Sequence, residues 1–542
     1  MEDQYILILG AGLMQRPAIE AAKNLGYKTF IVDGNPNAVC VPFVDKFEPI
    51  DLKDKDKIAE LALSLKGNLA AVFTAGTDFS TTVSYVAEKC KLPSHTYKAS
   101  CNASNKIKMR ECFKKENVPS PNFQEVERSK ITTLLVPEVL NNMKFPKVVK
   151  PIDNMGARGC RMIRDKSEFL PAVEDAVRNS KSGKAILEDY MKGDEFSIDA
   201  LVFNNTITIT GFADRHIFYE PYFIETGHTI PTAIDEKKKY ELIECFAKGI
   251  HSLGLTCGAA KADIKYTENG PMIGEIAARL SGGFMSGWTY PFASGLDLTE
   301  QALLIALGKE PESMLQRRKP LPIKDSEYGI YEVPCMKTSA ERAWISIPGT
   351  VEVLLGTNQV SAMPYSRNIL IRNLPGSEAV FPRNNVEKCG NIIAVAKKRE
   401  LAVNTAENAV AEIVLRLKRN NPTTDNFLEG IELPAEKKFP PNAYDLPNDV
   451  NEKLNNYINS LGNKMIGANE CVEPLIPECL TELSSSIKDF NHRSIRLSLQ
   501  LFDKICKSHP DLEEKIFWKD LIRGGVQGII YYSDCLSNEK KR

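Results

Sequence analysis

The first hundred residues alternate apolar runs with amphipathic stretches. YILILG, KTFIVD and LAAVFTAG, which begin at residues 5, 28 and 69, have the length and composition of buried parallel strands. RPAIEAAKNLG and STTVSYVAEKCK, which begin at 16 and 80, place apolar residues at helical spacing. The alternation predicts a small doubly wound α/β domain over residues 1–99, with three or four strands.

A second region, residues 100–312, mixes helices with strand pairs. A basic helix is predicted in NKIKMRECFKKENVPSP, and FPKVVKPIDNMGARGCRMI reads as strand, glycine-bearing loop and strand. KAILEDYMKGDEFSIDALVF gives two strands joined by a Lys-Gly turn. GAAKADIKYTENGPMIGEIAARLSGG gives two more across an Asn-Gly turn. The helix LDLTEQALLIALG closes this domain.

The rest of the chain divides into a β-rich and a helical part. Over residues 313–420, YGIYEVP, GTVEVLLG, NILIRNLPG and NIIAVAKK predict short strands, and NTAENAVAEIVLRLK predicts a helix after them. Over residues 421–542, helices are predicted in VNEKLNNYINSLGNKM, PECLTELSSSIKDF and SIRLSLQLFDKIC. We therefore expect a multidomain α/β and α+β protein that ends in a helical accessory domain.

Composition narrows the class of protein. The 69 basic and 70 acidic residues balance, so nothing points to a nucleic-acid or membrane partner. The N-terminus does not resemble a signal peptide and no apolar run is long enough to span a bilayer, so we expect a cytoplasmic protein. The 13 cysteines are scattered without a Cys-x-x-Cys pair, which indicates reduced thiols rather than a zinc site.

The stretch ILILGAGLMQRP contains a partial dinucleotide fingerprint. Gly10 and Gly12 suit a tight turn, and Asp33 lies at about the right distance to hold a ribose. Gln15, however, stands where a third small residue normally lets helix and strand approach. A nicotinamide oxidoreductase is therefore one alternative, and an ordinary strand-turn-helix is the other.

The central region has the residues needed to hold a nucleoside triphosphate. Lys106 begins a helix, and Lys150 ends an apolar strand, where its charge is costly unless it meets an anion. Gly156 and Gly159, in the next loop, would let the backbone lie close over that anion. Each residue also has an ordinary explanation, a surface cation or a simple turn. No P-loop motif occurs in the sequence.

Further along the same region, four carboxylates are candidates for binding the nucleotide or a metal ion. Glu188 and Glu195 bracket a turn whose backbone could contact the edge of a purine. Glu195 could accept hydrogen bonds from ribose hydroxyls. Asp263 and Glu275 lie on two strands joined by a tight turn and can point at one spot, where a magnesium ion would make the pair favourable. Arg279, just beyond, could stabilise charge on a transferred phosphoryl group.

The order of these motifs resembles the ATP-grasp superfamily, over roughly residues 1–420. NKIKMR, FPKVVKPIDNMGARGC, ILEDYMKGDEFS and ADIKYTENGPMIGEIAARLSGG carry the resemblance. The first domain looks like a pre-ATP-grasp domain, the second like the ATP-grasp domain, and the third like the C-terminal domain of the biotin-carboxylase-like branch. ARLSGG is similar to ligases that join amino acids.

The resemblance implies a role for each residue. Lys106 and Lys150 would bind ATP phosphates under the loop of Gly156 and Gly159. Adenine would meet Glu188 and Met191, and the ribose Glu195. Asp263 and Glu275 would carry Mg²⁺, and Arg279 would face the acyl phosphate or, with the backbone of Gly282 and Gly283, hold a carboxylate. Two departures bear on the metal: Ala277 stands where many members have Asn, and Asp263 where glutamate is commoner.

The expected function is an ATP-dependent ligase that activates a carboxylate as an acyl phosphate and joins it to an amine, for example of an amino acid. Its partners would be ATP, Mg²⁺ and the two small substrates, and the protein could be a homodimer. The alternatives are a purine-biosynthetic or carboxylating member of the superfamily, a nicotinamide-dependent oxidoreductase, and a non-catalytic nucleotide sensor, which the departure at Ala277 favours.

Overall fold

The computed structural model describes residues 4–65, 67–323, 329–430 and 439–537. The chain divides into two compact units. The first comprises the chain up to His216, His228–Ser339 and Val395–Arg399, and the second comprises Ile217–Gly227, Ala340–Ala394 and the chain from Glu400. Each unit is described by itself below. The predicted division into four domains stays a prediction.

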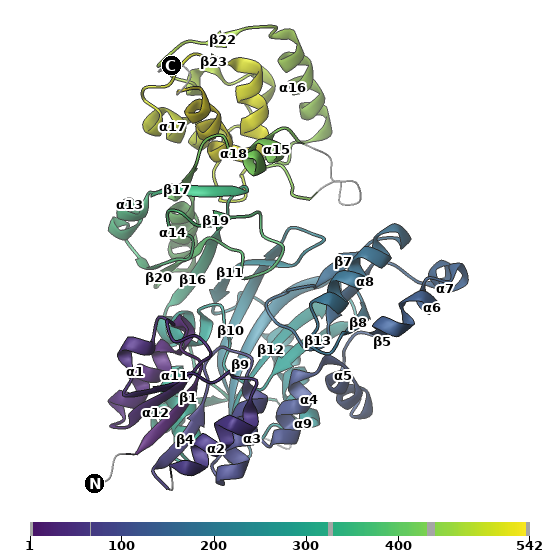
Figure 1. Cartoon of the computed structure of the whole chain (residues 1–542), viewed down its shortest axis with the longest axis vertical. Helices are drawn as coiled ribbons and strands as arrows, with labels where there is room; N and C mark the ends of the chain where they lie inside the picture. The colour runs from purple at the N-terminus through teal and green to yellow at the C-terminus, as the bar shows by residue number, and fades with distance from the viewer. Residues whose placement is uncertain (1–3, 66, 324–328, 431–438, 538–542) are drawn as a thin grey trace. The chain divides into compact units, whose positions relative to one another are not determined.

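The predicted N-terminal α/β domain is present in the first unit (Figure 1). A parallel sheet has the order β3-β2-β1-β4. Alternate residues of β1 face opposite sides: Leu7 and Leu9 pack with α2 and α3, while Ile6 and Ile8 pack with α1 and α11. The elements are β1 (Tyr5–Leu9), α1 (Arg16–Asn24), β2 (Lys28–Val32), β3 (Lys46–Glu48), α2 (Lys55–Ser64), β4 (Leu69–Phe73), α3 (Ser80–Cys90) and α11 (Leu298–Ala306).

A second sheet of the first unit has the order β5-β8-β6-β7 and is antiparallel. The predicted strand-loop-strand is present, since β6 pairs with β7 across the glycine-bearing loop. Helix α8 packs on this sheet, as Figure 1 shows, and buries Phe169 and Val173 against Val149 and Leu187. The elements are β5 (Phe123–Glu127), α6 (Ile131–Leu134), α7 (Pro137–Asn142), β6 (Lys147–Pro151), β7 (Arg161–Ile163), α8 (Phe169–Arg178) and β8 (Lys184–Asp189).

A larger sheet begins with the order β13-β12-β9-β10. The predicted hairpin of β12 and β13 is present, and β12 also pairs with β9. The strands β8 and β9, joined by the Lys-Gly turn, belong to different sheets. One face of the sheet packs on α4, α5 and α9. The elements are α4 (Tyr97–Ser104), α5 (Lys106–Lys115), β9 (Gly193–Phe203), β10 (Thr206–Phe218), β11 (Ile224–Ile230), α9 (Glu236–Leu253), β12 (Gly258–Thr267) and β13 (Gly270–Ala277).

Two further strands of the first unit belong to the large sheet. The strand expected in YGIYEVP is β15, and it pairs with β10 of the large sheet and with β14. The start of that stretch, Tyr328, lies outside the described residues. The remaining elements of this part are α10 (Tyr290–Ser294), α12 (Glu312–Arg317), β14 (Lys319–Pro320) and β15 (Gly329–Glu332).

The second unit contains the other predicted short strands. An antiparallel sheet has the order β19-β17-β21, and β18 pairs with β20. The helix predicted over residues 404–418 is wrong at its end: α14 stops at Glu412, and the β-branched and leucine-rich VLRL forms β21 against β17. The elements are β16 (Thr338–Trp344), β17 (Gly349–Leu355), α13 (Thr357–Ala362), β18 (Ser366–Ile371), β19 (Glu378–Ala379), β20 (Gly390–Ala396), α14 (Arg399–Glu412) and β21 (Val414–Leu417).

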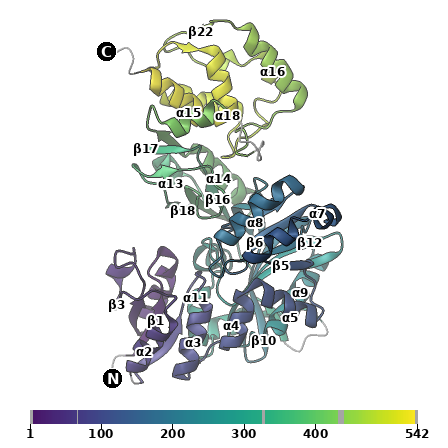
Figure 2. The same cartoon turned by 45° about the vertical axis from the view of Figure 1, so that its right-hand side comes forward.

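The C-terminal part of the second unit is mainly helical, as Figure 2 shows. Two of the three predicted helices are present as α16 and α17. PECLTELSSSIKDF instead forms a short 3-10 helix, Glu478–Leu480, followed by turns, so that prediction is wrong. Helix α18, which is kinked at Gly525, was not predicted. The elements are α15 (Pro422–Leu428), α16 (Asn448–Ser460), β22 (Met465–Ile466), α17 (Ile495–Ile505), β23 (Leu512–Glu513) and α18 (Glu514–Leu536).

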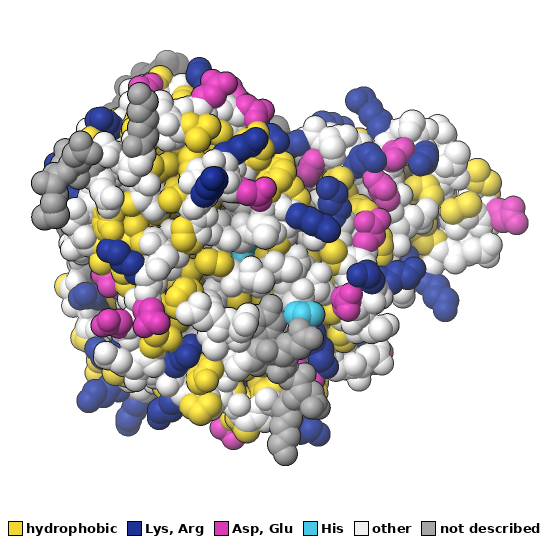
Figure 3. Space-filling view, turned by 90° about the horizontal axis from the view of Figure 1, so that it is seen from below, with side chains coloured by type: hydrophobic (Ala, Val, Ile, Leu, Met, Phe, Trp, Pro, Cys, Tyr) yellow, Lys and Arg dark blue, Asp and Glu magenta, His cyan; other side chains and the backbone are white. Residues whose placement is uncertain are grey.

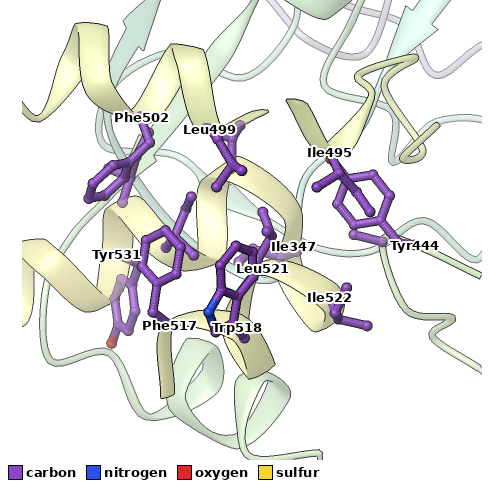
Figure 4. Close-up of a cluster of buried hydrophobic side chains, with 14 of the residues drawn as sticks. Ile347, Tyr444, Ile495, Leu499, Phe502, Phe517, Trp518, Leu521, Ile522 and Tyr531 are labelled. Carbon is purple, nitrogen blue, oxygen red and sulfur yellow. The ribbon is translucent and has the colours of Figure 1, made fainter. Parts of the chain in front are cut away.

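These helices enclose an aromatic core. Phe502, Phe517 and Trp518 make edge-to-face ring contacts, and Trp518 is fully buried (Figure 4). The same cluster includes Ile347 and Val414 from the strand-rich part of this unit. The helical segment and the short strands of the second unit therefore share one core.

The surface agrees with the balanced composition. Figure 3 shows basic and acidic side chains interspersed on the face that it presents. All the cysteines are free thiols, as predicted, and Cys471 is exposed. Within the described ranges, no helix combines the length and the apolar character that crossing a membrane requires.

Candidate functional site

One face of the large sheet is lined with charged residues. Side chains alternate between the faces of a strand. In β12 the even positions Ala262 and Ile264 are buried against the helices, so Lys261, Asp263 and Lys265 face the opposite side. The register pairs Lys265 with Glu195 of β9. The adjacent strands β12 and β9 thus bring two predicted site residues, Asp263 and Glu195, to one surface.

Arg215 of β10 joins these two carboxylates. Its Nη1 lies 2.6 Å from Oε1 of Glu195 and 2.5 Å from Oδ1 of Asp263. Lys261 Nζ is also 2.5 Å from Oδ1 of Asp263, and Lys265 Nζ is 3.3 Å from Oε2 of Glu195. In this structure, protein cations neutralise the groups predicted to meet the metal and the ribose.

The two predicted metal ligands face each other directly. Asp263 and Glu275 are paired residues in the β12–β13 ladder. Burial raises the pKa of Glu275, but Lys106 and Lys150 outweigh it, so the pKa lies below its ordinary value and the group is an anion. Among the described residues no cluster of three or more His, Cys, Asp or Glu could hold a metal. Two carboxylates still fit Mg²⁺, which commonly takes one or two together with substrate phosphates and water.

Lys106 stands at the start of α5, where the side chain of Asn105 caps the helix by accepting from the N–H groups of Ile107 and Lys108. Lys106 is 6% exposed, and its Nζ lies 3.5 Å from Oε1 of Glu275 and donates to the carbonyl of Asn154 at 3.0 Å. Burial lowers its pKa, but Glu275 and other carboxylates raise it more, so the group is a cation. Lys106 therefore connects Glu275, a predicted metal ligand, to the glycine-bearing loop.

Lys150 and Glu188 form a buried ion pair. The Lys150 Nζ is 2.6 Å from Oε2 of Glu188, and the Nε of Arg110 donates to Oε1 at 2.7 Å. Burial raises the pKa of Glu188, but the two cations more than offset it and hold the pKa below its ordinary value. Glu188 is 2% exposed, so in this structure its carboxylate orients two cations.

The loop between β6 and β7 has the conformation that glycine allows. Gly156 and Gly159 both have φ of 67°, which side-chain-bearing residues rarely adopt. A Cβ on Gly159 would lie 2.8 Å from Cβ of Asn179. The loop starts beside Lys150 and receives the Lys106 hydrogen bond, so the four residues predicted to bind phosphate lie on connected elements.

Met191 lies in the irregular segment that connects β8 to β9. Its Cε would lie 3.5 Å from a Cβ on Gly274, the neighbour of Glu275. The predicted adenine contact, Met191, therefore lies beside the β12–β13 hairpin that carries the predicted metal ligands, on a segment without regular secondary structure.

Arg279 follows β13 in the loop that contains ARLSGG. Its Nη1 donates to the carbonyl of Leu280 at 3.0 Å, and its Nε lies 3.9 Å from Oδ1 of Asp78. Asp199 of β9 holds the loop by accepting from the backbone N–H and the hydroxyl of Ser281 at 3.1 and 2.6 Å. Arg279 is therefore held by the Leu280 carbonyl, while its Nε makes no hydrogen bond with the described residues.

The glycine turn at the N-terminus has local hydrogen bonds. Oδ2 of Asp33 accepts from the N–H of Ala11 at 2.7 Å, and Oδ1 accepts from that of Asn35 at 2.8 Å. Gln15 donates to the carbonyl of Ala75 at 2.6 Å and accepts from its N–H at 2.9 Å. Asp33 thus closes the turn and Gln15 ties it to the end of β4, which supports the ordinary strand-turn-helix.

Four cations of the site were not predicted from the sequence: Arg110, Arg215, Lys261 and Lys265. Arg110 lies four residues after Lys106, on the same face of α5, so helical spacing was a signal for it. Lys261 lies two residues before Asp263, on the same strand face. Nothing in the sequence pattern near Arg215 indicates that it reaches two carboxylates.

Comparisons with known proteins identify two domains of the chain and its fold. An ATP-grasp domain model matches residues 143–287, and a model of the L-amino acid ligase C-terminal domain 2 matches residues 343–418. The fold is similar to an L-amino acid ligase from Bacillus licheniformis, with a TM-score of 0.64, 18% identity, and coverage of 77% of this chain and 100% of that chain.

Two curated relatives are similar in sequence. The uncharacterized protein y4rH of Sinorhizobium fredii is 23% identical over 422 residues, which cover 76% of this chain and 83% of that protein. Carnosine synthase 1 of Homo sapiens is 22% identical over 340 residues, 57% of this chain but only 40% of that protein. The family matches confirm the predicted resemblance, and the oxidoreductase alternative is not favoured. The chain therefore combines an ATP-grasp domain with a domain that matches the L-amino acid ligase C-terminal domain 2.

Proposed function

We propose that this protein uses ATP to activate the carboxylate of a small molecule and joins it to the amine of an amino acid or a similar compound. The observation that carries the proposal is the pairing of Asp263 with Glu275 across one ladder, with Lys106 bridging to the glycine-bearing loop. Carboxylates for a metal and cations for phosphates thus meet at one place on the sheet.

The proposed reaction has two steps. A carboxylate oxygen of the first substrate attacks the γ-phosphorus of ATP, and ADP leaves. The amine nitrogen of the second substrate then attacks the acyl carbon, inorganic phosphate leaves and the nitrogen loses a proton. No protein nucleophile is needed, so catalysis rests on positioning and on stabilising charge.

Each site residue has a role in this scheme. Lys106 and Lys150 hold phosphate oxygens while the loop of Gly156 and Gly159 covers them. The segment of Met191 meets adenine, and Glu195 meets the ribose. Glu188 acts on ATP mainly by orienting Lys150, as their ion pair indicates.

Asp263, Glu275 and Arg279 would act on the metal and on the acyl phosphate. Asp263 and Glu275 would hold Mg²⁺, which neutralises charge on the phosphates when it is bound. Because Arg215 and Lys261 contact Asp263 in this structure, we expect both to turn toward phosphate oxygens when ATP and Mg²⁺ are present. Arg279 contacts the carboxylate and then the acyl phosphate.

The amino-acid substrate is supported by the domain match. The model over residues 343–418 is that of an L-amino acid ligase domain, and one curated relative is named as a carnosine synthase. A non-catalytic nucleotide sensor is the second candidate, because Ala277 provides no amide oxygen for a second metal ion.

A phosphate-release screen tests the proposal. Pairs of amino acids and other carboxylates with amines are added to protein, ATP and Mg²⁺, and both phosphate and coupled product are measured. We expect release that requires both substrates. ATP binding without release for any pair supports the sensor, and stabilisation by NADP but not ATP overturns both. Light scattering of the same preparation tests the predicted homodimer.

A further inference from the structure

A cavity of about 60 Å³ lies next to Arg279 in the first unit. Its walls come from the ends of β4 and β12, from α3, from α11 and from the loop after β13. The apolar part of the wall includes Phe73, Val83, Pro93, Cys257, Ala302 and Ala306.

The strand register places this cavity in line with the proposed reaction centre. Ala259, Lys261 and Asp263 alternate on one face of β12, and Ala259 belongs to the cavity wall. Two strand residues span about 6.7 Å. Along this face of β12, the proposed metal ligand Asp263 is followed by Lys261 and then by the cavity. Arg279 lines the same cavity from the end of the adjacent strand β13.

The polar groups in the wall already have partners. The Ser84 hydroxyl lies 2.6 Å from that of Ser100 and 3.2 Å from that of Ser94. His95 contacts the carbonyl of Ala259 through Nε2 at 3.0 Å and accepts from two backbone N–H groups through Nδ1. Burial lowers the pKa of His95 to about 4, so the imidazole is neutral at physiological pH.

Arg279 provides the charged end of the cavity. Its Nε makes no hydrogen bond with the described residues, and the nearest carboxylate oxygen, Oδ1 of Asp78, is 3.9 Å away. This donor is available for the carboxylate of a substrate whose side chain enters the cavity.

We propose that the cavity binds the side chain of the amino acid whose carboxylate is activated, and that this side chain is aliphatic, uncharged and small. The proposal rests on the proposed function. A cavity needs a volume of about 10–15 Å³ to hold one water molecule. Because a non-hydrogen atom of a side chain is about as large as a water molecule, this cavity of about 60 Å³ takes roughly four to six of them. Valine and leucine side chains fit, and aromatic ones exceed the space. Away from Arg279, a charged side chain would meet neutral groups of the wall that are already paired.

The test is a substrate series with the whole chain. Phosphate release is measured with glycine, alanine, valine, leucine, phenylalanine, aspartate and lysine as the carboxylate substrate, with one amine acceptor. We expect kcat/KM for valine or leucine to exceed that for phenylalanine, aspartate and lysine by about tenfold or more. Ala302→Leu fills the cavity and should lower the ratio of kcat/KM for leucine to that for glycine by about tenfold or more.

Ala103→Leu is the matched control, because Ala103 is also a helix alanine with 3% exposure but lies outside the cavity wall. It should leave the leucine-to-glycine ratio within about threefold. A preference for aromatic or charged substrates, or an equal ratio in Ala302→Leu and wild type, would overturn the cavity proposal while the ligase activity stands. An Ala302→Leu protein that does not fold is replaced by Ala302→Val, with the same criterion. Absence of release for every substrate overturns the proposed function and this proposal together.

Discussion

At the scale of single residues, the buried triad of Arg110, Glu188 and Lys150 shows how a costly charge is kept in place. The buried charge of a lysine at the end of an apolar strand needs an opposite charge beside it. Glu188 provides that charge, with its Oε2 2.6 Å from Nζ of Lys150. Because Arg110 holds the other carboxylate oxygen, Glu188 stays paired when Lys150 turns toward a phosphate. The same arrangement lets Lys150 be removed without leaving an isolated buried anion.

Lys150→Ala should therefore fold but bind ATP more weakly. Loss of a charge-assisted phosphate contact costs roughly 1.5–3 kcal/mol of binding free energy, and turnover should be abolished. Calorimetric titration with ATP measures the first and phosphate release the second. Lys147→Ala is the control, since Lys147 is on the same strand and pairs with Asp189 of β8 at 2.5 Å, but faces the other way. Unchanged ATP affinity in folded Lys150→Ala would remove Lys150 from the site.

Glu275→Gln keeps the volume of the side chain and removes its charge. If Glu275 holds Mg²⁺, the variant should need at least about tenfold more magnesium for half-maximal phosphate release, a difference of roughly 1.4 kcal/mol. A magnesium titration at fixed ATP measures this. Glu268→Gln, in the exposed turn of the same hairpin, is the control. Equal magnesium requirements for the two variants would make Glu275 structural.

Arg279→Lys separates binding of ATP from chemistry. Lysine cannot reproduce the two parallel hydrogen bonds that a guanidinium makes to a carboxylate or acyl phosphate. ATP affinity should stay near wild type while kcat falls by roughly a hundredfold, because the lost interaction strengthens as charge develops. Both quantities are measured on one preparation. If product formation is also near wild type, the acyl-phosphate site lies elsewhere.

At the scale of elements, the ATP-grasp motifs could be predicted because each one is local. The β12–β13 hairpin, the strand-loop-strand around Gly156 and the helix that starts at Lys106 follow from turn residues and apolar spacing within about 25 positions. Roles that depend on sheet pairing could not be predicted. The position of Arg215 between Glu195 and Asp263 depends on β10, β9 and β12 being neighbours, which no local pattern encodes.

Sheet pairing and local hydrogen bonds also account for the wrong helix predictions. VLRL directly continues the apolar residues of the predicted helix, yet it pairs with β17 and forms β21. PECLTELSSSIKDF has helical spacing, but its serines compete for backbone hydrogen bonds, as the Ser484 hydroxyl does by donating to the carbonyl of Thr481. Helix α18 contains Gly525 with φ of 61°, and this non-helical residue interrupts the helical pattern.

Asp199 links β9 to the loop of Arg279, and its pKa gives a pH test of that link. Burial is the main cause that raises the pKa of Asp199 to about 6, although Ser281 lowers it. A carboxyl whose folded-state pKa is raised favours folding while protonated, so its contribution is present below pH 4 and is lost as the pH rises to about 6. Wild type should lose stability over this range relative to Asp199→Asn. Urea unfolding at pH 4, 5, 6 and 7 measures both proteins, and a constant difference would contradict the assignment.

At the scale of the whole molecule, the residues of the proposed chemistry and the aromatic core around Trp518 belong to different units. All the site residues named above lie in the first unit, and Trp518 and its partners lie in the second. Stability of the second unit can therefore be perturbed without touching a residue of the site.

Trp518→Ala makes use of this separation. Trp518 is fully buried, packs edge-to-face on Phe517, and its indole N–H donates to Oε1 of Glu514 at 3.3 Å. Its truncation leaves a large cavity and should lower the free energy of unfolding by about 3–5 kcal/mol. Leu374→Ala in the same unit is the control: this leucine is 59% exposed, so the change should stay within about 0.5 kcal/mol. At a temperature where Trp518→Ala is folded, its ATP affinity should equal that of wild type. Weaker ATP binding by the folded variant would show that the second unit influences the nucleotide site, and an unchanged unfolding free energy would contradict the role of Trp518 in the core.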